Sequence, residues 1–137
     1  GRVKVLRIAS AHDVGKPINP CLIEGQIQGA LAMGIGTTLF EQMELEEGSV
    51  MNPSFTGYKI PSALDVPEMI PIIVEEPHRQ GPYGAKGLGE PALAPTAAAI
   101  ANAIYAASGV RIKDLPITPE KILEGLEKRR KDEKEGE

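Results

Sequence analysis

The residues best suited to chemistry lie in a glycine-rich stretch, residues 81–91, which ends in a carboxylate. It reads Gly-Pro-Tyr-Gly-Ala-Lys-Gly-Leu-Gly-Glu-Pro. Glycines allow the main chain to come close to a ligand, because they carry no side chain. Pro91 favours an extended conformation at Glu90 and suits the first turn of a helix. If this junction closes on a dry pocket, desolvation makes the Glu90 carboxylate a better proton acceptor near neutral pH.

The same stretch also fits a structural interpretation. A Gly/Pro-rich segment is often only a turn, and a glutamate beside a helix start is favoured by the helix dipole alone. The stretch matches neither the dinucleotide-binding fingerprint nor the P-loop, so it does not indicate either kind of nucleotide site. The residue types alone leave the catalytic and the structural interpretations open.

Three other side chains, His12, Asp13 and Cys21, could in principle bind a metal or react, but each is expected to have a structural role. His12 and Asp13 are adjacent, but a metal site needs three or four convergent ligands, so we predict no metal held by side chains of this chain. Asp13 is expected to accept hydrogen bonds from backbone donors in a turn. Cys21 is the only cysteine and cannot form an internal disulfide. We expect a buried, inert thiol in a reduced, cytoplasmic setting.

Composition limits the classes of partner. The 137 residues carry a formal net charge of −4, which argues against a general nucleic-acid binder because such proteins need a basic face. No apolar run approaches the roughly 18 residues of a membrane span, so no membrane association is expected. The composition therefore favours a soluble protein whose ligands are small molecules or other chains.

An α+β fold, with mixed strands and two or three packed helices, follows from the local patterns. Apolar residues four apart and a proline and glycine at opposite ends of an alanine-rich run indicate helices, whereas short β-branched runs indicate strands. The expected elements are a strand at Val3–Ala9, a loop at 11–20, a helix from Cys21 to about Phe40, an acidic hairpin end at Glu44–Ser49, a strand at Ile70–Glu75, a helix at Pro95–Ser108 and a helix that Thr118 caps and Pro119 begins.

The first helix contains glycines and glutamines that indicate close packing or contact with a ligand. Glycines at 25, 29 and 36 thin one face so that another backbone can come close, because each interior glycine otherwise costs about 1 kcal/mol relative to alanine. Gln26 and Gln28 need hydrogen-bond partners if buried, and a polar cofactor edge could provide them, although exposure is equally compatible. The apolar surface of this helix and of the helix at Pro95–Ser108 is larger than a chain of 137 residues can cover, so we expect the chain to associate or form oligomers.

Several motifs in order resemble the C-terminal end of the molybdenum-binding subunit of the xanthine dehydrogenase and aldehyde oxidase family. The resemblance covers nearly the whole chain. It is carried by Asp13-Val14-Gly15 with Ile18-Asn19-Pro20, Glu24-Gly25-Gln26-Ile27-Gln28-Gly29, Gly34-Ile35-Gly36, Tyr58-Lys59-Ile60-Pro61, Gly84-Ala85-Lys86-Gly87-Leu88-Gly89-Glu90-Pro91 and Leu115-Pro116-Ile117-Thr118-Pro119.

This resemblance implies part of a molybdenum hydroxylase, an oxidoreductase that hydroxylates an aldehyde or N-heterocycle carbon with water-derived oxygen. Glu90 matches the catalytic base, and Gln26 would hydrogen-bond the molybdopterin cofactor. Lys86, Gly87 and Gly89 would lie close to the cofactor. The family's cysteine-rich iron–sulfur segments and its flavin domain have no counterpart here, so iron–sulfur clusters and FAD are expected only on partner chains.

The resemblance also sets the expected organisation of the chain. Residues 1–127 would form the C-terminal portion of a molybdopterin-binding domain rather than a complete independent domain, followed by a charged, disordered tail over residues 128–137. The molybdenum cofactor would be shared with other subunits, and the chain alone would be inactive. The alternative is a non-catalytic fragment or assembly module of this fold that binds partner chains.

Overall fold

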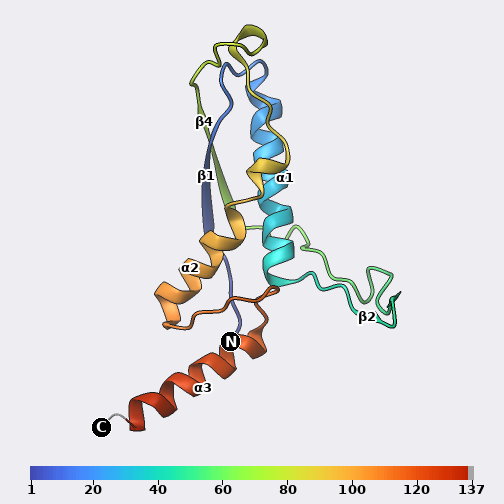
Figure 1. The fold of residues 1–137 in the computed structure, drawn as a ribbon, viewed down its shortest axis with the longest axis vertical. Helices are drawn as coiled ribbons and strands as arrows, with labels where there is room; N and C mark the ends of the chain where they lie inside the picture. The colour runs from blue at the N-terminus through green and yellow to red at the C-terminus, as the bar shows by residue number, and fades with distance from the viewer. Residues whose placement is uncertain (136–137) are drawn as a thin grey trace.

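Two parallel strands and a long helix form the body of the molecule (Figure 1). A computed structural model describes residues 1–135. In it, β1 (Arg7–Asp13) pairs in parallel with β4 (Glu68–Val74), and α1 (Pro20–Leu39) packs beside β4. The remaining elements are the strands β2 (Leu45–Glu46) and β3 (Ser49–Val50), the 3₁₀ turns η1 (Pro82–Gly84) and η2 (Glu90–Ala92), and the helices α2 (Thr96–Ser108) and α3 (Pro119–Glu135). The predicted mixture of strands with packed helices is confirmed.

The first strand lies further along the chain than the sequence indicates. The apolar run Val3–Ala9 predicts it, but pairing with β4 occupies Arg7–Asp13. Val3 and Val5 pack instead against the apolar cluster shared by α1, α2 and α3. Those side chains are therefore apolar because they cover helices, not because they belong to a sheet. The shift brings His12 and Asp13 into the strand rather than into the following loop.

The long helix α1 forms as its sequence predicts. Pro20 occupies the first turn, and the Asn19 side chain accepts a hydrogen bond from the Leu22 amide at 3.2 Å, which caps the helix start. The expected apolar stripe is buried at its centre, where Ile27 is 0% exposed. The stripe faces β1 and β4 near its start and α2 near its end. Its buried members are Ile27, Leu31 and Ile35.

A glycine allows α1 and α2 to approach closely. A Cβ atom at Gly34 would overlap the Thr96 side chain, whose Cβ would lie 2.5 Å away. By contrast, a Cβ at Gly25 or Gly29 would meet no atom within 4 Å among the described residues. The close approach predicted from interior glycines is thus made inside this chain at Gly34 and Gly36, while Gly25 and Gly29 face open space.

A matched pair of substitutions tests this packing. Gly34→Ala should lower the free energy of unfolding of the chain by about 1–3 kcal/mol, because the added methyl overpacks the helix crossing. Gly29→Ala should instead raise it by up to about 1 kcal/mol, because alanine is the better helix former and the site is open. Urea unfolding followed by far-UV circular dichroism measures both. Equal changes in the two variants would contradict the crossing.

The helix α2 ends as predicted, and α3 begins as predicted. Gly109 adopts a left-handed conformation, with φ of 71°, and its amide donates to the Tyr105 carbonyl at 2.7 Å. Thr118 Oγ1 accepts from the Lys121 amide at 3.4 Å at the start of α3. Ile122 is buried on the inner face of α3, whereas Leu123 is 48% exposed.

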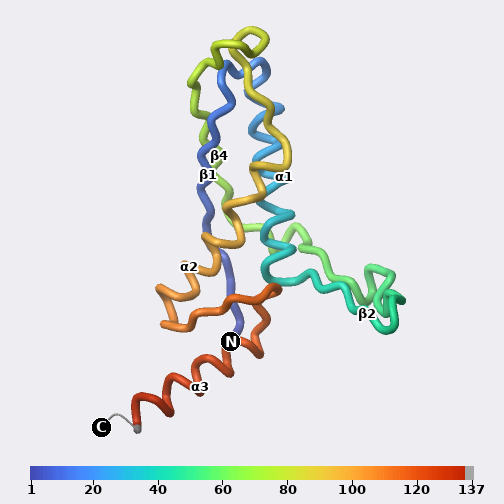
Figure 2. The backbone as a smooth tube through the Cα atoms, in the orientation of Figure 1, coloured from blue at the N-terminus to red at the C-terminus, as the bar shows by residue number. Residues whose placement is uncertain are grey.

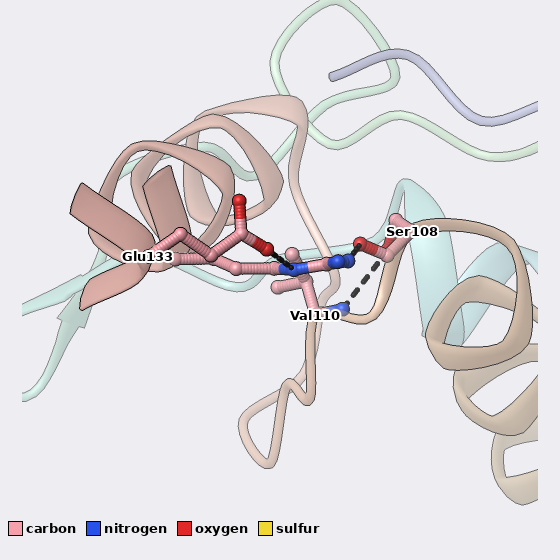
Figure 3. A network of polar contacts seen from close by, with 4 residues as sticks. Ser108, Val110 and Glu133 are labelled. Atoms are coloured by element: carbon pink, nitrogen blue, oxygen red, sulfur yellow. Dashed lines mark hydrogen bonds and ion pairs between the residues drawn. The ribbon is translucent and has the colours of Figure 1, made fainter. Parts of the chain in front are cut away.

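The disordered tail predicted over residues 128–137 is wrong as far as the structure describes it. The helix α3 continues without interruption to Glu135, and residues 136–137 lie outside the described residues. Arg129 explains the continuation, because its Nη1 donates to the Ser108 carbonyl at 2.8 Å and its Nε donates to Glu133 Oε1 at 2.8 Å (Figure 3). The guanidinium thereby satisfies a carbonyl at the C-terminal end of α2, where a cation is favourable.

An arm, residues 41–66, leaves the body between α1 and β4 (Figure 2). It carries the antiparallel pair of β2 and β3, which confirms the hairpin expected at the acidic turn. Large apolar side chains on the arm are exposed, as is typical of interfaces. These are Met43, Leu45, Met51, Phe55, Ile60 and Leu64. Within residues 1–135, no helix combines the length and apolar character needed to cross a lipid bilayer.

Candidate functional site

The candidate site lies where β1 and β4 end and α1 begins, at the top of Figure 1. The carboxyl ends of neighbouring parallel strands lie at the same edge of a sheet, where ligands commonly bind. Two loops meet there. The β1–α1 loop (residues 14–19) follows β1, and the glycine loop (residues 81–91) follows β4 after a short connection. Residues far apart in the sequence are thus neighbours in space.

Backbone hydrogen bonds join the two loops. The Lys86 amide donates to the Val14 carbonyl at 2.9 Å, and the Lys16 amide donates to the Gly84 carbonyl at 2.8 Å. Gly15, between these donors, has φ of 62°, a left-handed conformation that glycine adopts most readily. A Cβ atom at Gly15 would also overlap the Gly84 carbonyl oxygen. Glycine is therefore required where the loops touch.

Side chains reinforce the contact between the loops. Asp13 Oδ2 forms an ion pair with Lys86 Nζ, and Asp13 Oδ1 accepts from the Gly15 amide at 2.9 Å. The hydrogen bond from Lys86, followed by that from Gly15, lowers the pKa of Asp13 below its ordinary value. Because the pKa is lowered, the stabilising contribution is present above the unfolded-state value and is lost only as the pH falls through the folded-state value. The predicted turn role of Asp13 is confirmed, and the Lys86 pair is additional.

Gln26 and Lys86 face the same hollow. This hollow of about 280 Å³ lies between the start of α1 and the two loops. Its wall mixes apolar carbons with two amides and two ammonium groups, so it could hold a flat, polar molecule that carries negative charge. The lining residues are Val14, Lys16, Ile18, Asn19, Leu22, Ile23, Gln26, Ala85, Lys86 and Leu88. The structure thus brings together two residues that the sequence analysis assigned to a cofactor.

The segment after Lys86 presents bare backbone. A Cβ atom at Gly87 or Gly89 would meet nothing within 4 Å. Among residues 1–135, the amides of Gly87, Leu88 and Gly89 make no hydrogen bond. The Leu88 side chain packs against the buried cluster of Ile8, Ile27 and Leu31, which anchors the loop. Unpaired amides in a glycine segment are suited to bind oxygen atoms of a ligand.

Comparisons with known proteins point to one family. A family profile described as a molybdopterin cofactor-binding domain matches residues 1–67. Over 125 residues the chain is 45% identical to the xanthine dehydrogenase molybdenum-binding subunit of Escherichia coli O157:H7, an alignment that spans 90% of the chain. The chain belongs to the xanthine dehydrogenase and aldehyde oxidase family of molybdopterin-binding subunits. The resemblance inferred from the motifs is confirmed.

Solved structures of this family share the fold. The chain is similar to quinoline 2-oxidoreductase from Pseudomonas putida 86, with a TM-score of 0.84 and 36% identity over 90% of this chain and 16% of that one. It is equally similar to the aldehyde oxidoreductase from Desulfovibrio desulfuricans, with a TM-score of 0.84 and 39% identity over 91% of this chain and 14% of that one. The chain spans 17% of the length of the Escherichia coli xanthine dehydrogenase subunit.

Glu90, the residue predicted to be the catalytic base, lies at the start of η2. The backbone there is held, because the Leu93 amide donates to the Glu90 carbonyl at 2.9 Å and η2 contacts α1. The Glu90 side chain itself is exposed. The dry pocket that would make this carboxylate a strong base is therefore not formed by residues 1–135.

Two other residues differ from their expected surroundings. Cys21 was predicted to be buried, but it is exposed in the first turn of α1 because the stripe facing the strands begins at Ile23. His12 Nε2 lies 2.7 Å from Ser10 Oγ. The described residues contain no group of three or more His, Cys, Asp or Glu side chains placed to bind a metal ion. The cofactor contacts of this family member would thus come from amides, ammonium groups and backbone.

Proposed function

We propose that the chain supplies a cofactor-binding surface and a proton acceptor to a molybdenum hydroxylase that acts on an aldehyde or N-heterocycle carbon. The names of the similar proteins, a xanthine dehydrogenase subunit, a quinoline 2-oxidoreductase and an aldehyde oxidoreductase, support these two substrate classes. The observation that carries the proposal is the shared hollow of Gln26 and Lys86 beside a loop with free amides.

The residues present fit a molybdopterin cofactor. Molybdopterin combines a pterin ring, which has hydrogen-bonding edges, with a phosphate. The hollow offers the Gln26 amide and the Lys86 ammonium group, and the glycine loop beside it offers unpaired amides. Gly87 and Gly89 leave room for close approach, because a side chain there would project into the open space. When bound, the cofactor would supply the oxidising centre that hydroxylates the substrate with oxygen from water.

Glu90 would act as the base in this arrangement. Its backbone is fixed at the start of η2, while its side chain is free to extend from the body of the chain. Once the remaining protein covers it, the carboxylate would lose water and become a better acceptor for a proton released as oxygen is transferred to the substrate. The chain's own contribution is thus the position of the carboxylate rather than the complete pocket.

The rest of the enzyme would come from elsewhere. The chain spans 17% of the length of the xanthine dehydrogenase subunit, so the cofactor would be shared with other subunits, and iron–sulfur clusters and FAD would lie on partner chains. The exposed apolar arm of residues 41–66 supports docking to such partners. We therefore expect no turnover from the chain alone.

Molybdenum content tests the cofactor contact. In the assembled enzyme, Gln26→Ala should weaken cofactor binding about 10- to 100-fold, the loss expected when a hydrogen bond to a charged or desolvated group is removed. Gln28→Ala is the matched control, because Gln28 is also an exposed amide on α1 but does not line the hollow. Elemental analysis of molybdenum per enzyme at limiting cofactor measures both variants.

The outcomes separate the proposed function from its alternative. A loss of molybdenum in Gln26→Ala with normal content in Gln28→Ala supports the cofactor contact. Normal content in both variants would contradict it. If the enzyme purified from its native source held no molybdenum at all, the chain would be an assembly module rather than part of a molybdenum site.

A further inference from the structure

The glycine loop is held at Lys86 by two interactions, one with the last residue of β1 and one with the first residue of the β1–α1 loop. Asp13 Oδ2 pairs with Lys86 Nζ, and the Lys86 amide donates to the Val14 carbonyl at 2.9 Å. Asp13 Oδ1 in turn accepts from the Gly15 amide at 2.9 Å, so this carboxylate is fixed on both oxygens. The side chain of Lys86 is thus bound to the last residue of β1, and its backbone to the first residue of the β1–α1 loop.

The residues after Lys86 have few other restraints. The amides of Gly87 and Gly89 make no hydrogen bond among residues 1–135. Leu88 packs on the cluster of Ile8, Ile27 and Leu31, and the next fixed point is η2, which begins at Glu90. The path of this three-residue segment therefore depends on the packing of Leu88 and on where Lys86 is held. The backbone at Gly87 and Gly89 can change conformation easily, because glycine has wide conformational freedom.

We propose that Asp13 is a positioning residue for the proton acceptor: by holding Lys86, it sets the path of residues 87–89 and so the placement of Glu90. This inference rests on the proposed function of Glu90. Both oxygens of Asp13 have partners within the chain. Asp13 acts through the loop and does not itself touch the substrate.

The ion pair between Asp13 and Lys86 is better suited to position the glycine loop than to stabilise the whole domain. The Asp13 and Lys86 side chains are 39% and 29% exposed, and partly exposed pairs of this kind contribute little to the stability of a whole domain. Their hydrogen bond keeps the pKa of Asp13 low, so the carboxylate is ionised across the neutral range.

The chain offers a matched control beside this pair. Lys16 Nζ and Glu75 Oε2 form an ion pair at 3.2 Å, and Lys16 also belongs to the β1–α1 loop. Glu75, however, lies directly after β4 and before the glycine loop begins, and it makes no contact with Lys86. Glu75→Gln thus removes a neighbouring charge pair between the same two regions without releasing the glycine loop.

The test compares Asp13→Asn with Glu75→Gln in the assembled enzyme. Asn keeps the size of Asp and an acceptor for the Gly15 amide but removes the charge that holds Lys86. Turnover per bound molybdenum should fall about 10- to 100-fold in Asp13→Asn, since misplacement of a catalytic group by about 1 Å has an effect of that order. The KM and the molybdenum content should change less than twofold, and Glu75→Gln should leave turnover per bound molybdenum unchanged.

A second measurement does not depend on activity. Amide hydrogen exchange over residues 84–90 should become faster in Asp13→Asn, while exchange in α2 should remain as in the unsubstituted protein. If Asp13→Asn prevents assembly, Asp13→Glu is tested in its place, because glutamate keeps the negative charge but moves the carboxylate away from its position in aspartate. A partial loss of turnover in Asp13→Glu, smaller than that in Asp13→Asn where both assemble, would support positioning.

The failures of the two proposals are distinguishable. Unchanged turnover and unchanged exchange in Asp13→Asn would overturn the positioning role, even if Glu90→Gln is inactive. A loss of molybdenum or a uniform rise in exchange across the whole chain would also overturn it, because such a result indicates only a structural role. If Glu90→Gln retains normal turnover, the base assignment fails, whatever Asp13→Asn shows.

Discussion

Glu90→Gln in the assembled enzyme should slow turnover per bound molybdenum by about 10²–10⁴, the range assigned to the loss of a general base. Glutamine has the shape of glutamate and can still form hydrogen bonds, but it cannot accept the proton. The backbone of η2 should be unaffected, because its hydrogen bonds do not involve the Glu90 side chain. The change should therefore fall on the chemical step rather than on folding or cofactor content.

The measurement needs molybdenum content and KM alongside the rate. We expect both to remain within about twofold of the unsubstituted enzyme, because an interaction made only in the transition state changes the rate and not ground-state binding. Glu75→Gln, which removes a carboxylate outside the hollow, serves as the control and should have no effect. Near-normal turnover in Glu90→Gln would return the glycine loop to its structural interpretation as a turn before a helix.

Local patterns were sufficient to predict the helices. The four-residue spacing from Ile23 to Leu39 corresponds to α1, and Gly109 ends α2 in the expected left-handed conformation. These features depend on residues within one or two turns of each other, so the sequence displays them directly. The tail was mispredicted for the opposite reason. Arg129 reaches the Ser108 carbonyl 21 residues earlier, and composition does not reveal such a contact.

The contacts that build the candidate site are long-range and could be predicted only in part. The motifs identified Gln26 and the glycine loop, but the ion pair between Asp13 and Lys86 joins residues 73 positions apart. One signal could have indicated it: Asp13 ends one parallel strand, Lys86 lies in the loop that follows the other, and the carboxyl ends of such strands lie at the same edge of a sheet. The strand prediction at Val3–Ala9 obscured this signal, because it placed Asp13 well beyond the strand end.

Ile27→Ala should lower the free energy of unfolding of the chain by about 2–5 kcal/mol, the range for removing a buried isoleucine side chain. Ile27 is 0% exposed and lies in the cluster with Ile8 and Leu31, against which Leu88 of the glycine loop packs. The lost methylene groups leave a cavity at the point where β1, α1 and the glycine loop meet. The substitution should therefore also loosen the loop, although it removes no polar contact of the site.

Urea unfolding of the chain measures this loss, with Leu64→Ala as the control. Leu64 is 95% exposed on the arm, so its truncation should change the free energy of unfolding by no more than about 0.5 kcal/mol. A loss below about 1 kcal/mol in Ile27→Ala would mean that the cluster is not closely packed in the separate chain. In that event the rest of the enzyme would be needed to form the core that anchors Leu88. The placement of the glycine loop would then also depend on the rest of the enzyme.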